Sequence, residues 1–556
     1  MITSILLSVL VYSSFSFWGI TSREIIWIFA QLHLNFAAFV IAIPTFALIV
    51  EFIGYWTKEE KYDNLAKDFA RLVAASLSLT SILGALFLFG LIAFYPKFFS
   101  HFTSVFSPTM IFYALLFLGE FFFAYLYFYA WDKMKHRKLL HLFIGLMLNV
   151  FGISIMFIAN AWTTYTMMPA GVSESGELIS LWDAINNEGW WPLNIHRLVA
   201  NLAFGGAIVA SYAAANFISA KSDLEKGYYD WMGYIGNFIA VSALIPLPFI
   251  GYWMGYEIYQ YDQQMGITMM GGVLSWGWIL QGVIIGVIFL SLNYYLWVGM
   301  QRMEGAERYS KFIPVLLTVI TLSLMVWFTP HTLVASLEEA RKMGATYHPV
   351  LSVLGIMTAK NTAVNLLLLA TYISFVIFRR CNKTPVVSWA RAGNFVFWGI
   401  ISAATIFIIY LGIKGYFVDT IVRLNYSVYQ VLSVLFVLVA GSIIDMMIYR
   451  KAKIAGITRW GNMPVRSQYI LIVIAVSFTW LMGLMGFIRS SIRLNWHVYK
   501  ILEDTSISAF VPSLGQASKM ISFITILFFI MLGFVFYISN LSDKRRPVQL
   551  LTTDLN

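Results

Sequence analysis

The sequence predicts an all-α fold, a polytopic transmembrane helical bundle of about 13–14 helices. Composition is the first reason, because 60% of the 556 residues are hydrophobic and only 12% are charged, whereas soluble domains carry about 25% charged residues. The second reason is that apolar runs of roughly twenty residues, the length that crosses a bilayer core, recur throughout the chain. The third is a regular alternation of charge between successive loops.

The predicted elements are one short segment and thirteen longer ones. The short segment covers about residues 3–20 and is predicted to be helical. The longer apolar segments lie near residues 25–56, 71–95, 108–131, 139–162, 192–219, 230–256, 271–299, 311–329, 350–378, 392–413, 426–449, 467–488 and 519–540. Each is long enough to span a hydrocarbon core of about 30 Å.

The basic residues gather in alternate loops. One set of loops holds 25 of the 37 Lys and Arg residues, and the positive-inside rule makes that set cytoplasmic. The net charge of +10 therefore reflects membrane topology, so we expect a lipid bilayer as partner and no nucleic acid. The single cysteine, Cys381, excludes a disulfide framework, a Cys-rich zinc site and a self-ligated iron–sulfur cluster.

Two histidines, His33 and His196, come early in helices that start on the outer side by the charge pattern, so they lie at a similar depth. An ionisable side chain is costly to bury in a membrane and commonly functional. A neutral imidazole is an axial ligand of haem iron, and helical bundles hold cofactors between facing helices. We therefore predict both as haem-iron ligands toward the extracytoplasmic side; the alternative is a packed histidine that only hydrogen-bonds. His136 and His141 fall in a basic cytoplasmic loop and are expected to be solvated.

Acidic side chains inside predicted helices form a second group of candidates. Glu120 has apolar residues for several turns on both sides, so we expect it to be protonated, paired or part of a proton relay. Glu51, near the cytoplasmic end of the first long helix, is a candidate proton entry group. Each has a plainer alternative, with Glu120 joining helices as a protonated acid and Glu51 as an interfacial residue.

A sequence pattern recurs late in the chain. Residues 422–432 read VRLNYSVYQVL, and residues 492–502 read IRLNWHVYKIL. Both copies place an arginine, Arg423 or Arg493, near an aromatic side chain, which suits a planar ligand that carries a carboxylate. Equally, the two arginines are explained as interfacial anchors whose guanidinium groups reach the water.

Four stretches resemble subunit I of the cytochrome bd quinol oxidases. They are residues 31–72, with the family's spacing between His33 and Glu51; residues 120–132, with Glu120 and a downstream Trp-Asp pair; residues 159–196, with Ala-Asn-Ala-Trp before His196; and residues 251–257, like the start of the family's quinol-binding loop. These stretches lie within roughly the first 260 residues, and residues 426–540 align more loosely.

The resemblance implies that His33 ligates a high-spin haem where oxygen reacts and that His196 ligates a low-spin haem that accepts electrons. It also implies a proton path at Glu120 and a donor side at Glu257. The predicted catalytic residues are Glu51, Glu120, Arg493 and Trp496, and the predicted cofactor-binding residues are His33, His196, Arg423, Asn160, Trp162 and Glu257.

The chain departs from the family at several positions. The family's Gly-Arg-x-Pro-Trp motif keeps only Arg493 and Trp496. Its ligating glutamate falls at Ser490, its ligating methionine near Leu432 and a second acid at Phe112, so Met254 and His497 are considered as substitute ligands. Apolar helices at about 271–378 replace the family's hydrophilic loop. The predicted divisions are a haem-binding bundle (1–260), inserted helices (261–390) and C-terminal helices with the repeated motif (391–556).

The leading hypothesis is a bd-like terminal oxidase subunit of a bacterial or archaeal plasma membrane. It would pass electrons from quinol or cytochrome c through two or more b-type haems, with haem d as a further candidate, to oxygen, which is reduced to water. A second membrane subunit and small subunits are the expected partners. One alternative is a haem b subunit that relays electrons between quinone and a partner complex without reducing oxygen. Another is a haem-free transporter that uses the histidines and acids as a proton relay.

Overall fold

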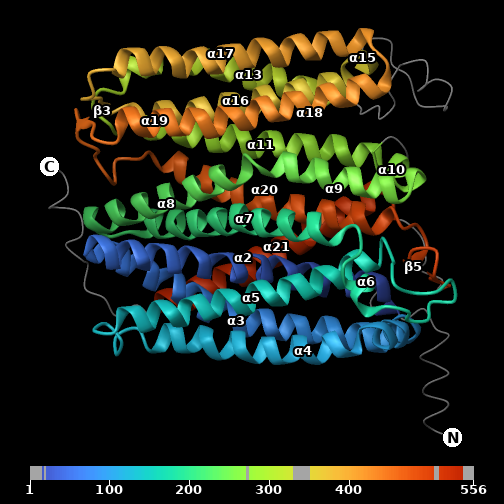
Figure 1. The fold of residues 1–556 in the computed structure, drawn as a ribbon. Helices are drawn as coiled ribbons and strands as arrows, with labels where there is room; N and C mark the ends of the chain where they lie inside the picture. The colour runs from blue at the N-terminus through green and yellow to red at the C-terminus, as the bar shows by residue number, and fades with distance from the viewer. Residues whose placement is uncertain (1–15, 18–19, 271–273, 330–350, 506–511, 542–556) are drawn as a thin grey trace, which may run out of the picture. The chain divides into compact units, whose positions relative to one another are not determined.

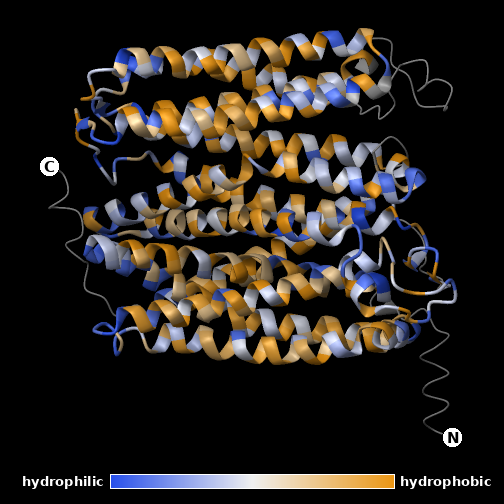
Figure 2. Cartoon of the chain, in the orientation of Figure 1, coloured by the Kyte–Doolittle hydropathy of each residue, from blue (hydrophilic) through white to orange (hydrophobic). Residues whose placement is uncertain are grey.

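The computed structural model describes residues 16–17, 20–270, 274–329, 351–505 and 512–541. Within these residues, thirteen helical spans are long and apolar enough to cross a membrane, which confirms the predicted polytopic all-α bundle. Figure 2 shows hydrophobic residues along the middle of the helices and hydrophilic residues toward their ends and in the turns. A bilayer favours this distribution, because its core offers no water to polar groups.

The segment at about residues 3–20 lies mostly outside the described residues. Where it is described, Ser16–Phe17 (β1) pairs antiparallel with Ile20–Thr21 (β2), so the helix prediction is wrong there. The Thr21 hydroxyl then accepts a hydrogen bond from Glu24 N, and the Glu24 carboxylate accepts one from Thr21 N at 2.8 Å. This capping box defines the start of the helix that carries His33.

Contacts divide the described chain into two compact units, each described by itself below. The first takes the residues up to Val209, Ser242–Met265 and those from Met482 on; the second takes Ala210–Val241 and Gly266–Leu481. Helices α7 (Trp190–Ser219), α8 (Asp223–Leu244), α10 (Gln263–Met270) and α20 (Val465–Ser491) have residues in both units. The divisions at residues 1–260, 261–390 and 391–556 concern sequence content and stay a prediction.

The first unit is a bundle of long helices. Its elements, besides β1, β2 and its parts of the shared helices, are α2 (Ser22–Thr57), α3 (Glu60–Phe94), α4 (Pro96–Tyr129), α5 (Lys138–Tyr165), α6 (Leu181–Ile185), α9 (Leu247–Tyr261), β5 (Trp496–Val498), β6 (Leu502–Glu503) and α21 (Leu514–Leu541). Helix α2 packs extensively along α3, α4 packs on α5 and α3, and α21 contacts α2 and α3 (Figure 1). Every predicted site residue except Arg423 belongs to this unit.

The second unit is built around α16. Its elements are α11 (Ser275–Met300), α12 (Glu307–Ser310), α13 (Ile313–Trp327), α15 (Leu351–Gly355), α16 (Met357–Arg380), β3 (Lys383–Thr384), α17 (Ala390–Lys414), the 3-10 turn η1 (Gly415–Phe417), α18 (Thr420–Phe436), the π-helical turn η2 (Val437–Gly441), α19 (Ser442–Tyr449) and β4 (Lys453–Ile454). Helix α16 contacts α11, α13, α17 and α18 (Figure 1). The buried Lys360 Nζ donates to the carbonyls of Val326 and Trp327, each at 2.8 Å. Lys360 thereby satisfies the open carbonyls at the end of α13.

Two buried ion pairs join helices of the second unit near their ends. Arg380 Nε donates to Asp445 Oδ1 at 2.6 Å, and Arg379 Nη2 lies 3.0 Å from Asp445 Oδ2. Arg302 pairs in the same way with Asp230, and both side chains are fully buried. Because a buried charge without its partner is costly, each pair stabilises only the arrangement in which both partners meet.

Replacing Asp445 by alanine should lower the free energy of unfolding by about 3–5 kcal/mol, because the buried Arg380 guanidinium loses its carboxylate. The matched control is Glu304→Ala, which removes the exposed partner of Arg459 and should cost about 1 kcal/mol or less. Thermal unfolding of both variants in the same detergent measures the difference, and equal losses would contradict the assigned role of the buried pair.

Candidate functional site

His33 projects from α2 against α3. Its Nδ1 lies 3.0 Å from Thr80 O, and because a carbonyl only accepts, Nδ1 carries the proton. Gly84 provides the space for the ring, since a Cβ at that position would lie 2.8 Å from His33 Cε1. The Nε2 atom is therefore the nitrogen with the free lone pair, as in histidines that ligate a metal.

His196 lies near the start of α7, beside α9. A Cβ on Gly251 would lie 3.9 Å from His196 Nε2, so the α9 backbone passes the ring with no side chain between them. Among the described residues, nothing forms a hydrogen bond with the His196 imidazole. Polar groups away from water are normally partnered, so this half-buried imidazole, with no partner among the described residues, fits a ligand position.

Around His196, one short stretch of α7 and one of α9 lack a closely packed face. Every residue in the stretches 195–200 and 246–252 is half-buried, whereas burial in a packed helix varies with the 3.6-residue period. This is the packing expected beside a bound planar group.

A polar chain runs beside His196. Arg197 Nη1 donates to Asn160 Oδ1 at 2.7 Å, and Asn160 Nδ2 donates to Asn194 Oδ1 at 2.8 Å. Asn160 and Asn194 are fully buried. The predicted cofactor residue Asn160 is thus brought next to the helical turn that carries His196.

Three arginines, Arg197, Arg489 and Arg493, form a group that we call the arginine cluster. Arg197 and Arg493 each lie close enough to Arg489 to be repelled by it. Arg489 Nη1 donates to Thr163 O at 3.3 Å, and Arg493 Nη1 donates to the His497 carbonyl. No carboxylate of the described residues forms an ion pair with any of the three.

The arginine cluster is therefore rich in positive charge, and no described residue supplies a counter-charge. Arg493 Nε is buried and has no hydrogen-bond partner among the described residues. Burial and the nearby Arg489 and Arg23 lower the pKa of Arg493 to about 9. Guanidinium groups pair bidentately with carboxylates, so the cluster fits a ligand with carboxylate groups, and haem is such a ligand.

Glu51 is fully buried toward the far end of α2 and is held by polar side chains. His141 Nδ1 lies 2.6 Å from Glu51 Oε1, and the Tyr127 hydroxyl donates to Glu51 Oε2 at 2.7 Å. His141 Nε2 lies 2.9 Å from the Tyr127 carbonyl, and Lys138 Nζ lies 3.8 Å from Glu51 Oε1. Glu51 and His141 can therefore share one proton between them.

The prediction that His141 is solvated is wrong, whereas His136 is exposed as expected. His141 is only 2% exposed. The reason is that α5 begins at Lys138, so His141 lies in its first turn and on the face that packs against α2 and α4.

Glu120 is buried in α4 against α5. A Cβ on Gly152 would lie 2.9 Å from Glu120 Oε1, so the carboxyl occupies the space that this glycine leaves. Within the described part of the chain, Glu120 forms no hydrogen bond or ion pair. A carboxyl in these surroundings holds a permanent charge only at high cost, which suits a group that takes up and releases protons.

Other predicted residues lie in separate surroundings. Trp162 Nε1 donates to Thr109 Oγ1 at 3.0 Å, which ties it to α4. Glu257 accepts a hydrogen bond from Trp253 Nε1 at 2.9 Å, one turn earlier in α9. Trp496 lies in β5, paired with Glu503 of β6.

The two substitute ligands differ in how their side chains are engaged. Met254 is half-buried in α9, one turn after Gly251, the residue beside His196. The His497 ring packs edge-on against Tyr95 at 5.0 Å, and its Nε2 lies 3.4 Å from Asp504 Oδ1. His497 thus has protein partners, and both assignments stay predictions.

The repeated sequence pattern does not form a repeated structure. Residues 422–432 lie in helix α18, whereas residues 492–502 form a turn and the β5–β6 hairpin. Leu494 and Lys500 adopt φ of 54° and 57°, which breaks the helix in the second copy. Arg423 lies in the second unit, where its Nε donates to Gly415 O at 2.6 Å.

Sequence reasoning missed Arg197 and Arg489 as functional candidates. Arg489 lies in the last turn of α20 and Arg493 lies two residues after its end, four residues further along the chain. Two arginines this close at the end of an apolar segment, with no acid between them, indicate a site for an anionic group. The contacts of His141 and Gly84 depend on helix packing and have no comparable signal.

The thirteen apolar helical spans of the described residues define a multi-pass membrane protein. A family model described as "Cytochrome bd terminal oxidase subunit I" matches residues 21–546. The chain belongs to this family of haem-binding respiratory oxidoreductases. Among solved structures, the bd oxidase from Geobacillus thermodenitrificans matches at 13% identity and a TM-score of 0.48, covering 94% of this chain and 98% of that chain. No curated protein matches.

Gly84→Ala should displace the His33 ring, because the new Cβ would lie 2.8 Å from Cε1. We expect a loss of about 1–3 kcal/mol in unfolding free energy and a lower content of carbon monoxide-binding haem. Gly90→Ala is the matched control in the same helix, since its Cβ would meet only the flexible end of Ile26. Carbon monoxide difference spectra and thermal unfolding compare the two, and identical behaviour would show that Gly84 does not seat His33.

Proposed function

We propose that the chain is the haem-bearing subunit of a terminal oxidase, with His33 and His196 as ligands of two b-type haems. The observation that carries this proposal is the state of His33, whose Nδ1 is held by Thr80 while Nε2 stays available. When bound, haem would supply electron transfer and oxygen binding, which no side chain of the described residues offers. The family membership supports the same assignment.

The two histidines would have different tasks. His33 would hold the group at which oxygen is reduced to water, and His196 the group that accepts electrons. The arginine cluster would bind carboxylates of the cofactor near His196, where Arg197 already joins the Asn160 and Asn194 chain. Haem d stays a candidate beside haem b at the His33 position.

The acids would supply protons to the reduction of oxygen. Glu51, with its bridge to His141 and Tyr127, is placed to accept a proton and pass it on because the carboxylate and the imidazole are 2.6 Å apart. Glu120, without a fixed partner among the described residues, would be a second station. Uptake would be from the cytoplasm, which the positive-inside rule assigns to the end of α2 that carries Glu51.

Quinol is the proposed electron donor, because the chain belongs to the bd oxidase family. Glu257 would belong to the donor side. The haem sites would then lie toward the extracytoplasmic face of a bacterial or archaeal plasma membrane. A second membrane subunit and small subunits would complete the enzyme.

His33→Ala should abolish the carbon monoxide-binding haem signal and leave a low-spin spectrum, because only the Nε2 ligand is removed. His196→Ala is the reciprocal variant and should remove the low-spin spectrum first. An unchanged carbon monoxide difference spectrum in His33→Ala would overturn the ligand assignment.

Oxygen consumption by the wild-type enzyme, measured with quinol and then with reduced cytochrome c, identifies the donor. No consumption with either, in a preparation that contains haem, would favour a subunit that only relays electrons between quinone and a partner complex. A pyridine haemochrome assay that finds no haem would favour the proton-relay transporter.

Glu51→Gln should slow oxygen consumption by roughly 10²-fold, the lower range for loss of a positioned proton-transfer group, while haem spectra stay normal. The amide keeps the size of the side chain but cannot carry the proton. Glu60→Gln, at an exposed acid in the first turn of α3, is the control and should leave the rate unchanged. Equal rates in both variants would remove Glu51 from the path.

A further inference from the structure

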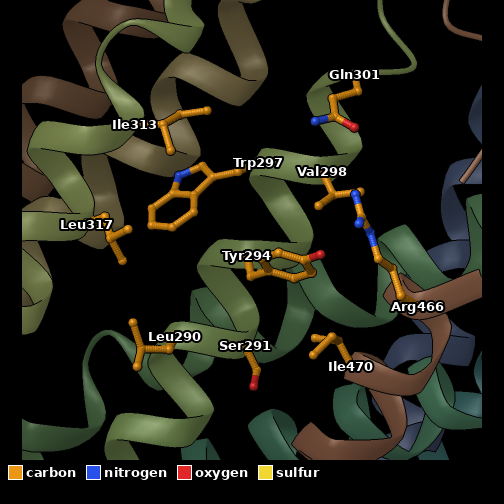
Figure 3. Close-up of a pocket in the computed structure, with 10 residues that line it drawn as sticks. All are labelled: Leu290, Ser291, Tyr294, Trp297, Val298, Gln301, Ile313, Leu317, Arg466 and Ile470. Carbon is orange, nitrogen blue, oxygen red and sulfur yellow. The ribbon is translucent and has the colours of Figure 1, made fainter. Parts of the chain in front are cut away.

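A cleft in the second unit lies outside the proposed oxidase site. It has a volume of about 520 Å³ and is bordered by α11, α13 and α20. Figure 3 shows side chains of all three helices around it. Its apolar border includes Leu290 of α11, Ile313 and Leu317 of α13, and Ile470 of α20.

The cleft is polar at one end. Gln301 follows directly after α11, and Arg466 is the second residue of α20, so both lie at helix ends. Leu290 lies eleven residues before Gln301, which is roughly 16 Å along a helix axis. The cleft therefore extends from the helix ends, where a membrane interface lies, into the apolar span.

Arg466 has no counter-charge among the described residues. Its side chain is exposed and, within the described part of the chain, it forms no ion pair or hydrogen bond. By contrast, Arg302 and Arg380 pair with Asp230 and Asp445, and the exposed Arg459 pairs with Glu304. The guanidinium group of Arg466 is thus available to an external anion.

The segment that leads to Arg466 adds further positive charge. Residues 450–466 contain five Lys and Arg residues and no Asp or Glu. This composition places the polar end of the cleft at the cytoplasmic face by the positive-inside rule. Anionic lipids are enriched in that leaflet, and basic pockets between membrane helices bind their head groups.

We propose that this cleft binds one anionic phospholipid of the surrounding bilayer. Arg466 would pair with the phosphate, Gln301 would donate its amide N–H to the head group, and an acyl chain would lie along Leu290, Leu317 and Ile470. The lining contains no His, Asp or Glu, so no side chain there is suited to take protons from a quinol. This separates the cleft from the donor site, and the proposal does not depend on the proposed function.

The test uses the complete purified protein in phosphatidylcholine vesicles with a small fraction of a photoactivatable lipid, either phosphatidylglycerol or phosphatidylcholine. Labelled peptides are mapped to α11, α13 and α20. We expect phosphatidylglycerol to label these helices more strongly than phosphatidylcholine.

Arg466→Gln should reduce that preference about fivefold, the contribution of one basic residue near a membrane surface. Arg450→Gln, at an exposed arginine of the same basic segment that does not line the cleft, should leave the preference unchanged.

A second pair of variants tests the apolar part. Leu317→Trp should fill the cleft and reduce labelling by both lipids, whereas Leu322→Trp, at another exposed leucine of α13 outside the cleft, should not. Equal labelling by the two lipids in the wild type, or an unchanged preference in Arg466→Gln, would overturn the proposal. Stronger labelling by a photoactivatable quinone that excludes the phospholipid would also overturn it.

Discussion

The cost of an unpaired charge in a hydrocarbon environment governs how this chain is built. In the second unit, two buried arginines meet opposite charges, Arg302 at Asp230 and Arg380 at Asp445. In the first unit, the arginine cluster has no carboxylate partner among the described residues. Since such a group is expensive to leave uncompensated, its counter-charge is expected from a bound molecule that carries carboxylates.

The packing of α2 on α3 positions the most informative histidine. Thr80 and Gly84 lie one turn apart on α3, so one supplies the hydrogen-bond acceptor and the other supplies the space. Toward the opposite end of the same helix, Glu51 is fixed by side chains of α4 and α5. A single helix thus carries a candidate ligand and a candidate proton carrier, and its neighbours decide the state of each.

The helices were predictable because membrane spans have a strong composition signal, and all thirteen longer apolar segments appear as spans. The placement of His33 and His196 inside helices of one bundle followed from the same pattern. Local conformation was not predictable. Residues 492–502 repeat the sequence of a helical segment, but Leu494 and Lys500 adopt positive φ, so the second copy is not helical. His141 was misjudged because its charged neighbours in sequence, such as Lys138, hid a face that packs inward.

The contact between His33 and Gly84 also has an evolutionary consequence. These positions are 51 residues apart in sequence and lie on different helices, yet the ring of one occupies the volume that a side chain at the other would need. A lineage that lost the glycine would have to move or abandon the histidine, whereas loss of the histidine would release position 84 from its restriction. The histidine and the glycine are therefore expected to be inherited together. A relative that has both residues is expected to place the imidazole ring in the same position.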